Sequence, residues 1–359
     1  MRADPRDGEA RWRAVRAALN AARGPLGEAA SALYPDVPRV AGTPLLCREE
    51  WIPRAPVPLE SVRLEWEDDP APPAVADPSD GLPAGHRTYA EAMAALARPA
   101  LFEDRPSHRL LAARPPVLRL GPARYFDGVN VGEAVAHELA AGTEGLPLRR
   151  RVGDPCDLTR RPALPAITTV TVVASPRAGS GGSRTEGRTG GHDAYVLHWR
   201  DPAKVAHAGG LYQVMPVGVF QPLGGEPPDL WRCMVREYAE ELLGTGEDYG
   251  DGFVQEEWPF HRAMTSAREE GRVRPYFLGL GVDPLTLAVD LLTAVVIDEE
   301  TFADLFGERV AVNDEGDVST APFDGTVPRP MQPAGAAALS LAWRHRRTLT
   351  ARPAPRPRP

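Results

Sequence analysis

Three glutamates on one short segment are the residues of this chain best suited to chemistry. The segment spans residues 236–241 and reads REYAEE. On a helix, Glu237, Glu240 and Glu241 stand three and four residues apart and share one face. Like charges placed so close repel one another unless a cation lies among them. Because hard divalent cations prefer carboxylate oxygens, the spacing predicts a site for Mg²⁺ or Mn²⁺.

An amphipathic helix must carry these carboxylates. The run DLWRCMVREYAEELLG, residues 229–244, has the periodicity of such a helix. We expect its apolar stripe to anchor the helix to a sheet and to leave the glutamates facing a cleft. The stripe consists of Trp231, Met234, Val235, Tyr238 and Leu242. A solvated acidic face is the alternative interpretation of the same pattern.

The segment resembles the signature of the Nudix hydrolase superfamily. That signature runs Gly, five residues, Glu, seven residues, Arg-Glu, an apolar residue, any residue, Glu-Glu, any residue, Gly. Residues 236–241 match its Arg-Glu-apolar-x-Glu-Glu core without a gap, and Gly244 follows one position late. Upstream, Gly218 is the candidate for the first glycine and Glu226 for the first glutamate, with a loop that is longer than the standard one.

The resemblance implies a mixed-sheet α/β/α sandwich that hydrolyses a nucleoside diphosphate linked to another group. By the same resemblance, the three glutamates would be catalytic ligands of Mg²⁺ or Mn²⁺, and Arg236 would orient a glutamate through an ion pair. A nucleotide-derived small molecule is the implied partner. Glu256 and Glu257 stand downstream of the helix, where the superfamily often places an extra carboxylate, although an acidic pair in a loop is the plainer interpretation.

Elements on both sides of the helix agree with this arrangement. The predicted strands are ALPAITTVTVVA (163–174), AYVLHWR (194–200), LYQVMPVGV (211–219) and DLLTAVVID (290–298). Their order around the motif is the usual order of the superfamily, and a further helix is predicted near the end of the chain. The predicted Nudix-like domain therefore spans residues 163–345, and the fold class is α/β.

The remaining parts of the chain carry no family resemblance. Residues 1–150 are predicted to form an N-terminal accessory region of α+β type. Within it, residues 9–33 predict two short helices separated at Gly24-Pro25, without a recognisable DNA-recognition helix. The proline-rich stretch 67–88 predicts a surface loop, and residues 346–359 predict a disordered Arg/Pro tail.

Composition argues against several classes of protein. The 359 residues carry a formal net charge of −8, so nucleic acid is an improbable partner. No apolar run is long enough to cross a membrane, and we do not expect the protein to bind a membrane. Cys47, Cys156 and Cys233 form no CxxC pair, which argues against a zinc knuckle or a disulfide framework. We expect a reducing, cytoplasmic setting.

Three functions are consistent with the sequence. The first is a metal-dependent nucleotide pyrophosphohydrolase. The second is a catalytically inactive nucleotide- or metabolite-sensing domain of a transcriptional regulator, and the third is a non-catalytic scaffold. Whether the chain is an enzyme is open at this point, as is its assembly into a homodimer. The geometry that separates these functions is whether the three glutamates converge with Glu226 or Glu256 around an open cavity.

Overall fold

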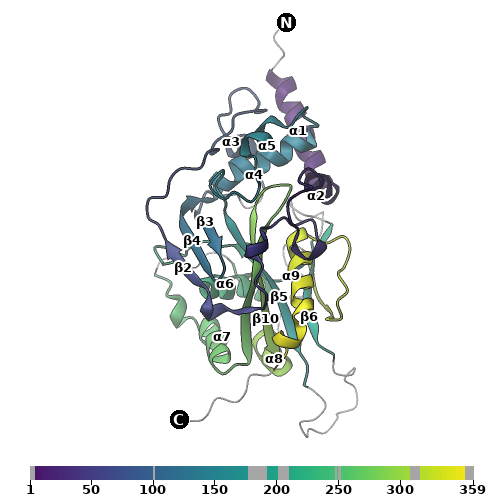
Figure 1. The fold of residues 1–359 in the computed structure, drawn as a ribbon. Helices are drawn as coiled ribbons and strands as arrows, with labels where there is room; N and C mark the ends of the chain where they lie inside the picture. The colour runs from purple at the N-terminus through teal and green to yellow at the C-terminus, as the bar shows by residue number, and fades with distance from the viewer. Residues whose placement is uncertain are drawn as a thin grey trace.

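A long mixed β-sheet forms the centre of the fold (Figure 1). The computed structural model describes residues 5–99, 102–176, 192–200, 210–246, 249, 252–307 and 316–351. Within these ranges the large sheet has eight strands and a smaller sheet has three. Together with the helices on the sheet, they confirm the predicted α/β class.

The strands of the large sheet follow the order β1-β9-β10-β5-β6-β11, with β7 beside β6 and β8 beside β5. Their bounds are β1 Val57–Pro58, β5 Pro165–Ala174, β6 Ala194–Arg200, β7 Leu211–Val214, β8 Val217–Val219, β9 Val273–Val282, β10 Val289–Asp298 and β11 Gly316–Pro322. The central strands β5 and β10 run parallel, from the pair Val289 and Pro165 to the pair Asp298 and Ala174. Both are buried along nearly their whole length. Such continuous apolar, β-branched strands are typical of a sheet covered on both faces.

Helices cover this sheet and the N-terminal end of the molecule (Figure 1). Their bounds are α1 Pro5–Ala21, α2 Arg23–Ala32, α3 Tyr89–Leu96, α4 Tyr125–Ala140, α5 Pro147–Val152, α6 Leu230–Leu243, α7 Pro259–Glu269, α8 Glu299–Phe306, α9 Pro333–Arg344 and α10 Arg346–Leu349. Helix α9 packs on β5, β7 and β10, α6 packs beside β8, and α7 packs beside β9. No helix in the described parts of the chain combines the length and the apolar character needed to cross a bilayer.

The N-terminal region is joined to the large sheet. Strand β1 pairs with β9, where Val57 lies opposite Phe277. A smaller sheet, in the order β2-β4-β3, is built from β2 Arg63–Trp66, β3 Pro106–Arg114 and β4 Val117–Arg124. One hydrophobic core includes buried residues from Trp12 to Leu349. The two predicted regions therefore share a core, and the boundary between them stays a prediction.

Three local expectations differ from the structure. The first helices separate at Ala22, and Pro25 lies in the first turn of α2, where a missing N–H costs little. Residues 67–88 form no regular element, yet Val75 is buried and its N–H donates to the carbonyl of Arg160. The predicted tail begins as helix α10, because Leu349 is buried in the core. Residues 352–359 lie outside the described residues.

A buried hydrogen-bond chain attaches α6 to β5. The Thr171 hydroxyl donates to the carbonyl of Met215 at 2.7 Å. Its single hydrogen is thereby used, so the Tyr238 hydroxyl donates to Thr171 Oγ1 at 2.6 Å. All three residues are fully or almost fully buried. The chain fixes how far α6 is rotated about its axis, since a hydrogen bond is directional whereas apolar packing is not.

Replacing Thr171 by Val tests this attachment. Val keeps the shape but leaves the Tyr238 hydroxyl and the Met215 carbonyl without this partner, so the free energy of unfolding should fall by about 1–3 kcal/mol. Urea denaturation measures the change. Thr320→Val, at an exposed position near the end of β11, is the matched control and should change it by less than about 0.5 kcal/mol. Additive losses for Thr171→Val and Tyr238→Phe in a double-mutant cycle would contradict the direct bond.

Candidate functional site

Helix α6 begins and ends with recognisable caps. The Asp229 carboxylate accepts a hydrogen bond from the Arg232 N–H at 2.9 Å at its start. Gly244 ends it in the left-handed conformation, at φ 68°. Every residue of the predicted apolar stripe, from Trp231 to Leu242, is buried. The prediction of the helix and of its buried face is therefore confirmed, and the glutamates lie half-buried on its other side.

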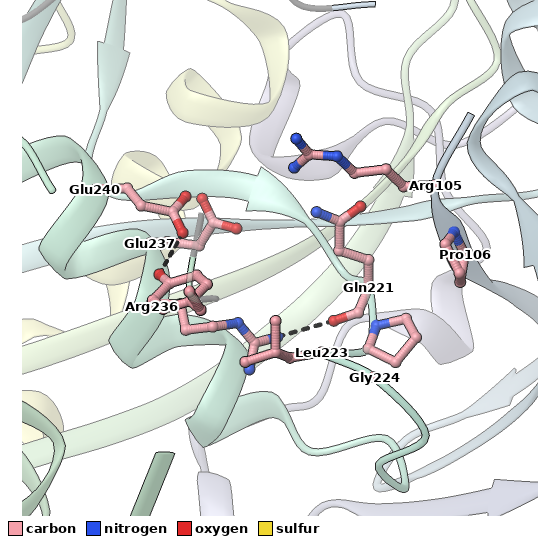
Figure 2. Close-up of a pocket in the computed structure, with 10 residues that line it drawn as sticks. Arg105, Pro106, Gln221, Leu223, Gly224, Arg236, Glu237 and Glu240 are labelled. Carbon is pink, nitrogen blue, oxygen red and sulfur yellow. Dashed lines mark hydrogen bonds between the residues drawn. The ribbon is translucent and has the colours of Figure 1, made fainter. Parts of the chain in front are cut away.

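A cavity of about 150 Å³ opens beside this face (Figure 2). It is lined by Arg105, Pro106, Gln221, Pro222, Leu223, Gly224, Arg236, Glu237, Glu240 and Tyr249. Four separate parts of the chain form its walls: the start of β3 with the residue before it, the loop after β8, α6, and Tyr249 in the segment after α6. Two of the three predicted metal ligands, Glu237 and Glu240, direct their carboxylates to the same wall (Figure 2).

Gly218 is the backbone surface against which Glu237 rests. A Cβ atom at Gly218 would lie 1.8 Å from the Glu237 Cδ and about as close to both carboxylate oxygens. Strand β8 carries this glycine and pairs with β5, which places it opposite Ile167. The structure therefore brings two residues of the predicted motif into direct contact, and a side chain at position 218 would fit only if the Glu237 carboxylate moved.

The other two glutamates have different surroundings. Tyr249 donates a hydrogen bond from its hydroxyl to Glu240 Oε1 at 2.5 Å, at the edge of the pocket. Burial, and then this bond to Glu240, raise the pKa of Tyr249, so the phenol stays protonated. Glu241 Oε1 accepts a hydrogen bond from the backbone N–H of Val217 at 3.1 Å. Glu241 therefore connects α6 to β8 and does not line the pocket.

Arg236 is buried, and its hydrogen-bond partners are uncharged. Its guanidinium donates to Gln255 Oε1 at 2.7 Å and to the backbone carbonyl of Gln221 at 2.9 Å. The resemblance implied an ion pair with a glutamate at this place. Gln255 is fully buried and donates in turn to the Arg232 carbonyl at 2.8 Å. No sequence pattern pointed to Gln255, which opens a three-residue 3₁₀ helix, residues 255–257, after α6.

Two of the remaining predicted carboxylates, Glu226 and Glu256, lie beside Arg232. This side chain forms ion pairs with Glu226 and with Glu256, whose Oε1 lies 2.5 Å from Arg232 Nη1. Glu257 is exposed. None of the three lines the pocket. The predicted carboxylates therefore do not form one group: two glutamates line the pocket, two pair with Arg232 one turn earlier on α6, and Glu241 and Glu257 belong to neither set.

The pocket offers hard oxygen ligands for a cation. Among the residues that the structure describes, no three His, Cys, Asp or Glu side chains are arranged to hold a metal ion by themselves. Mg²⁺, however, is usually held by one or two carboxylates together with the phosphates of a ligand. Glu237 and Glu240 on one wall fit that arrangement.

Comparison with known proteins adds no assignment to this geometry. No protein-family model matches the chain, and no curated protein matches it in sequence. The Nudix relationship therefore stays a prediction from the motif.

Gly218→Ala should move the Glu237 carboxylate. The methyl group would occupy its position, but the carboxylate is the free end of a flexible side chain, so the free energy of unfolding should fall by less than about 1.5 kcal/mol. A crystal structure of the variant would show the displaced carboxylate. Gly225→Ala is the matched control in the following loop, since a Cβ there meets no atom within 4 Å. An unmoved Glu237 would contradict the contact.

His108 of β3 is a buried imidazole close to this site. Its ring packs against Phe220 at 4.7 Å and Trp66 at 5.6 Å between centroids. Neither ring nitrogen has a hydrogen-bond partner among the described residues. Burial, and then the charge of Arg236, lower the pKa of His108 to about 4. The imidazole is therefore neutral in the folded protein at neutral pH.

This burial makes stability depend on pH. Between pH 6.5 and pH 4 the unfolded chain binds a proton at His108 that the folded chain does not, so the free energy of unfolding falls as the pH falls through that window. His108→Phe should reduce this decline, measured by urea denaturation at pH 7.5 and pH 5. The half-exposed His86, changed to Phe, is the control. The same decline in His108→Phe and in the unmodified protein would contradict the assignment.

Proposed function

We propose that the pocket beside α6 binds a phosphate-containing, nucleotide-derived ligand together with Mg²⁺ and hydrolyses its diphosphate linkage. One observation carries this proposal: the two acidic residues Glu237 and Glu240 line the same small pocket as two arginines, Arg236 and Arg105 (Figure 2). Carboxylates can bind a metal ion, and guanidinium groups can bind phosphate oxygens. A pocket that contains both suits a diphosphate together with its metal ion. The motif resemblance supports the same reaction class.

The size of the cavity indicates that only part of the ligand enters it. Pockets that enclose a whole drug-sized ligand measure roughly 300–1,000 Å³, whereas this cavity measures about 150 Å³. It has room for a charged group but not for an entire nucleotide derivative. The proposal therefore places the diphosphate in the cavity and the rest of the ligand at its mouth.

The chain's own residues have separate tasks in this proposal. Gly218 and Tyr249 hold the carboxylates of Glu237 and Glu240 in place. Gln255 holds the Arg236 guanidinium at the pocket wall without neutralising its charge. Mg²⁺ bound at the two carboxylates would neutralise charge on the phosphate oxygens and lower the pKa of a nearby water.

Thermal denaturation and a hydrolysis assay test the proposal together. Because the two carboxylates need phosphate oxygens to complete the coordination of Mg²⁺, the ion and a nucleoside diphosphate derivative together should raise the melting temperature more than either alone. The double variant Glu237→Gln and Glu240→Gln keeps the shape of the site but removes its charge. It should lose this shift, and hydrolysis should slow by about a thousandfold or more.

A matched variant separates this effect from a general loss of acidity. Glu257→Gln removes one exposed carboxylate outside the pocket and should keep both the shift and the rate. Full activity in the double variant would overturn the proposal, as would the absence of both binding and turnover across a panel of sugar- and ribose-linked nucleoside diphosphates. The latter result would favour the scaffold function.

A second candidate function is ligand sensing without catalysis. The observation that favours it is the position of the other carboxylates, since Glu226 is paired with Arg232 and Glu241 with the Val217 N–H. Fewer carboxylates are then directed at the pocket than the motif implies. A ligand that raises the melting temperature but is recovered unchanged after prolonged incubation would support sensing over hydrolysis.

A further inference from the structure

The N-terminal region supplies one wall of the pocket. Arg105 and Pro106 stand at the start of β3, outside the segment that resembles the Nudix signature. Two hydrogen bonds hold this segment against the start of α4. The Arg105 carbonyl accepts a hydrogen bond from the Tyr125 N–H at 2.9 Å, and the neighbouring Asp104 carboxylate accepts one from the Phe126 N–H, also at 2.9 Å.

The Arg105 side chain extends across the pocket toward Glu237 and Glu240 (Figure 2). It forms an ion pair with Glu103 at 3.0 Å, and the Glu103 side chain is 65% exposed. Because water and salt screen a pair this exposed, this pair by itself contributes little. The guanidinium thus lines the pocket on a segment whose backbone is hydrogen-bonded to the start of α4.

The opposite walls of the pocket differ in charge. A metal held at Glu237 and Glu240 would bind phosphate oxygens on that side of the pocket, and the oxygens on the far side of the same group would need another partner. A guanidinium is suited to these oxygens, because its planar fork donates two parallel hydrogen bonds to a phosphate. Arg105 faces that side, whereas Arg236 is held at the back of the wall by Gln255 and Gln221.

We infer that Arg105 is a ligand-binding residue that donates to the phosphate oxygens opposite the two glutamates, so that the N-terminal region completes the site. The inference rests on the proposed function, since it concerns the same pocket. It assigns a role to Arg105, a residue outside the motif, for which the motif implies none.

Calorimetric titration of the full chain with methylenediphosphonate, a diphosphate analogue that cannot be hydrolysed at its bridge, tests the inference in the presence of Mg²⁺. Arg105→Gln should weaken binding by about 10-fold to 100-fold, the range expected for a lost charge-assisted hydrogen bond. Arg105→Lys keeps the charge but not the fork, so its affinity should fall between the two. The melting temperature without ligand should be the same in all three proteins, which a structural role would not allow.

Arg87→Gln is the matched control, because Arg87 is an exposed arginine of the same region whose ion pair, with Glu91, lies away from the pocket. It should bind like the unmodified protein. If the unmodified protein binds the analogue and Arg105→Gln binds it equally well, the inference fails while the proposed function stands. If the unmodified protein does not bind the analogue, the proposed function fails and takes the role of Arg105 with it.

Discussion

The rotation of α6 is the constraint on which the site depends. The apolar stripe of the helix would tolerate a small turn about its axis, because apolar contacts have little directionality. The hydrogen bonds from Tyr238 to Thr171 and from Thr171 to the Met215 carbonyl do not tolerate it. With this rotation, Glu237 lies over Gly218 and Glu241 reaches the Val217 N–H. The buried face thus sets the direction of the charged one.

Charge around α6 is divided between two arginines that stand one turn apart. Arg232 takes the nearby carboxylates Glu226 and Glu256. Arg236 is held instead by an amide and a backbone carbonyl, which are dipoles without net charge. A guanidinium held by neutral groups keeps its full attraction for an anion, whereas one held by two carboxylates does not. This division places the positive charge where a ligand can use it.

The elements with strong local patterns could be predicted from the sequence. The β-branched runs of β5 and β10 and the amphipathic α6 lie where their residues indicate. Strand β9 was not predicted, because Gly279 and Gly281 look like turn residues. Glycine is needed at these two positions because segments distant in the sequence pack against them. A Cβ at Gly279 would meet the Trp51 carbonyl at 2.9 Å, and one at Gly281 would meet the Leu45 side chain.

The residues of the pocket could likewise be predicted only where they belong to one local pattern. The motif pointed to Glu237 and Glu240, whose spacing on one helix is a local property. Arg105 directly precedes a strand that is far away in the sequence, and Gln255 opens a short 3₁₀ helix after α6. No periodicity connects either residue to the glutamates. Only the packing of β3 and of the segment after α6 brings them together, and one sequence does not encode such contacts as a pattern.

The N-terminal chain that lies along β9 has a consequence for dissecting the protein. Leu46 exchanges two backbone hydrogen bonds with Val282, and Val57 pairs with Phe277. Truncation to a chain that starts at residue 163 would remove this cover from the outer edge of the sheet and leave a row of peptide groups without hydrogen-bond partners. Such an edge recruits other chains by strand addition. Recombinant fragments that start at residue 163 should therefore aggregate, and the two halves should be produced as one polypeptide.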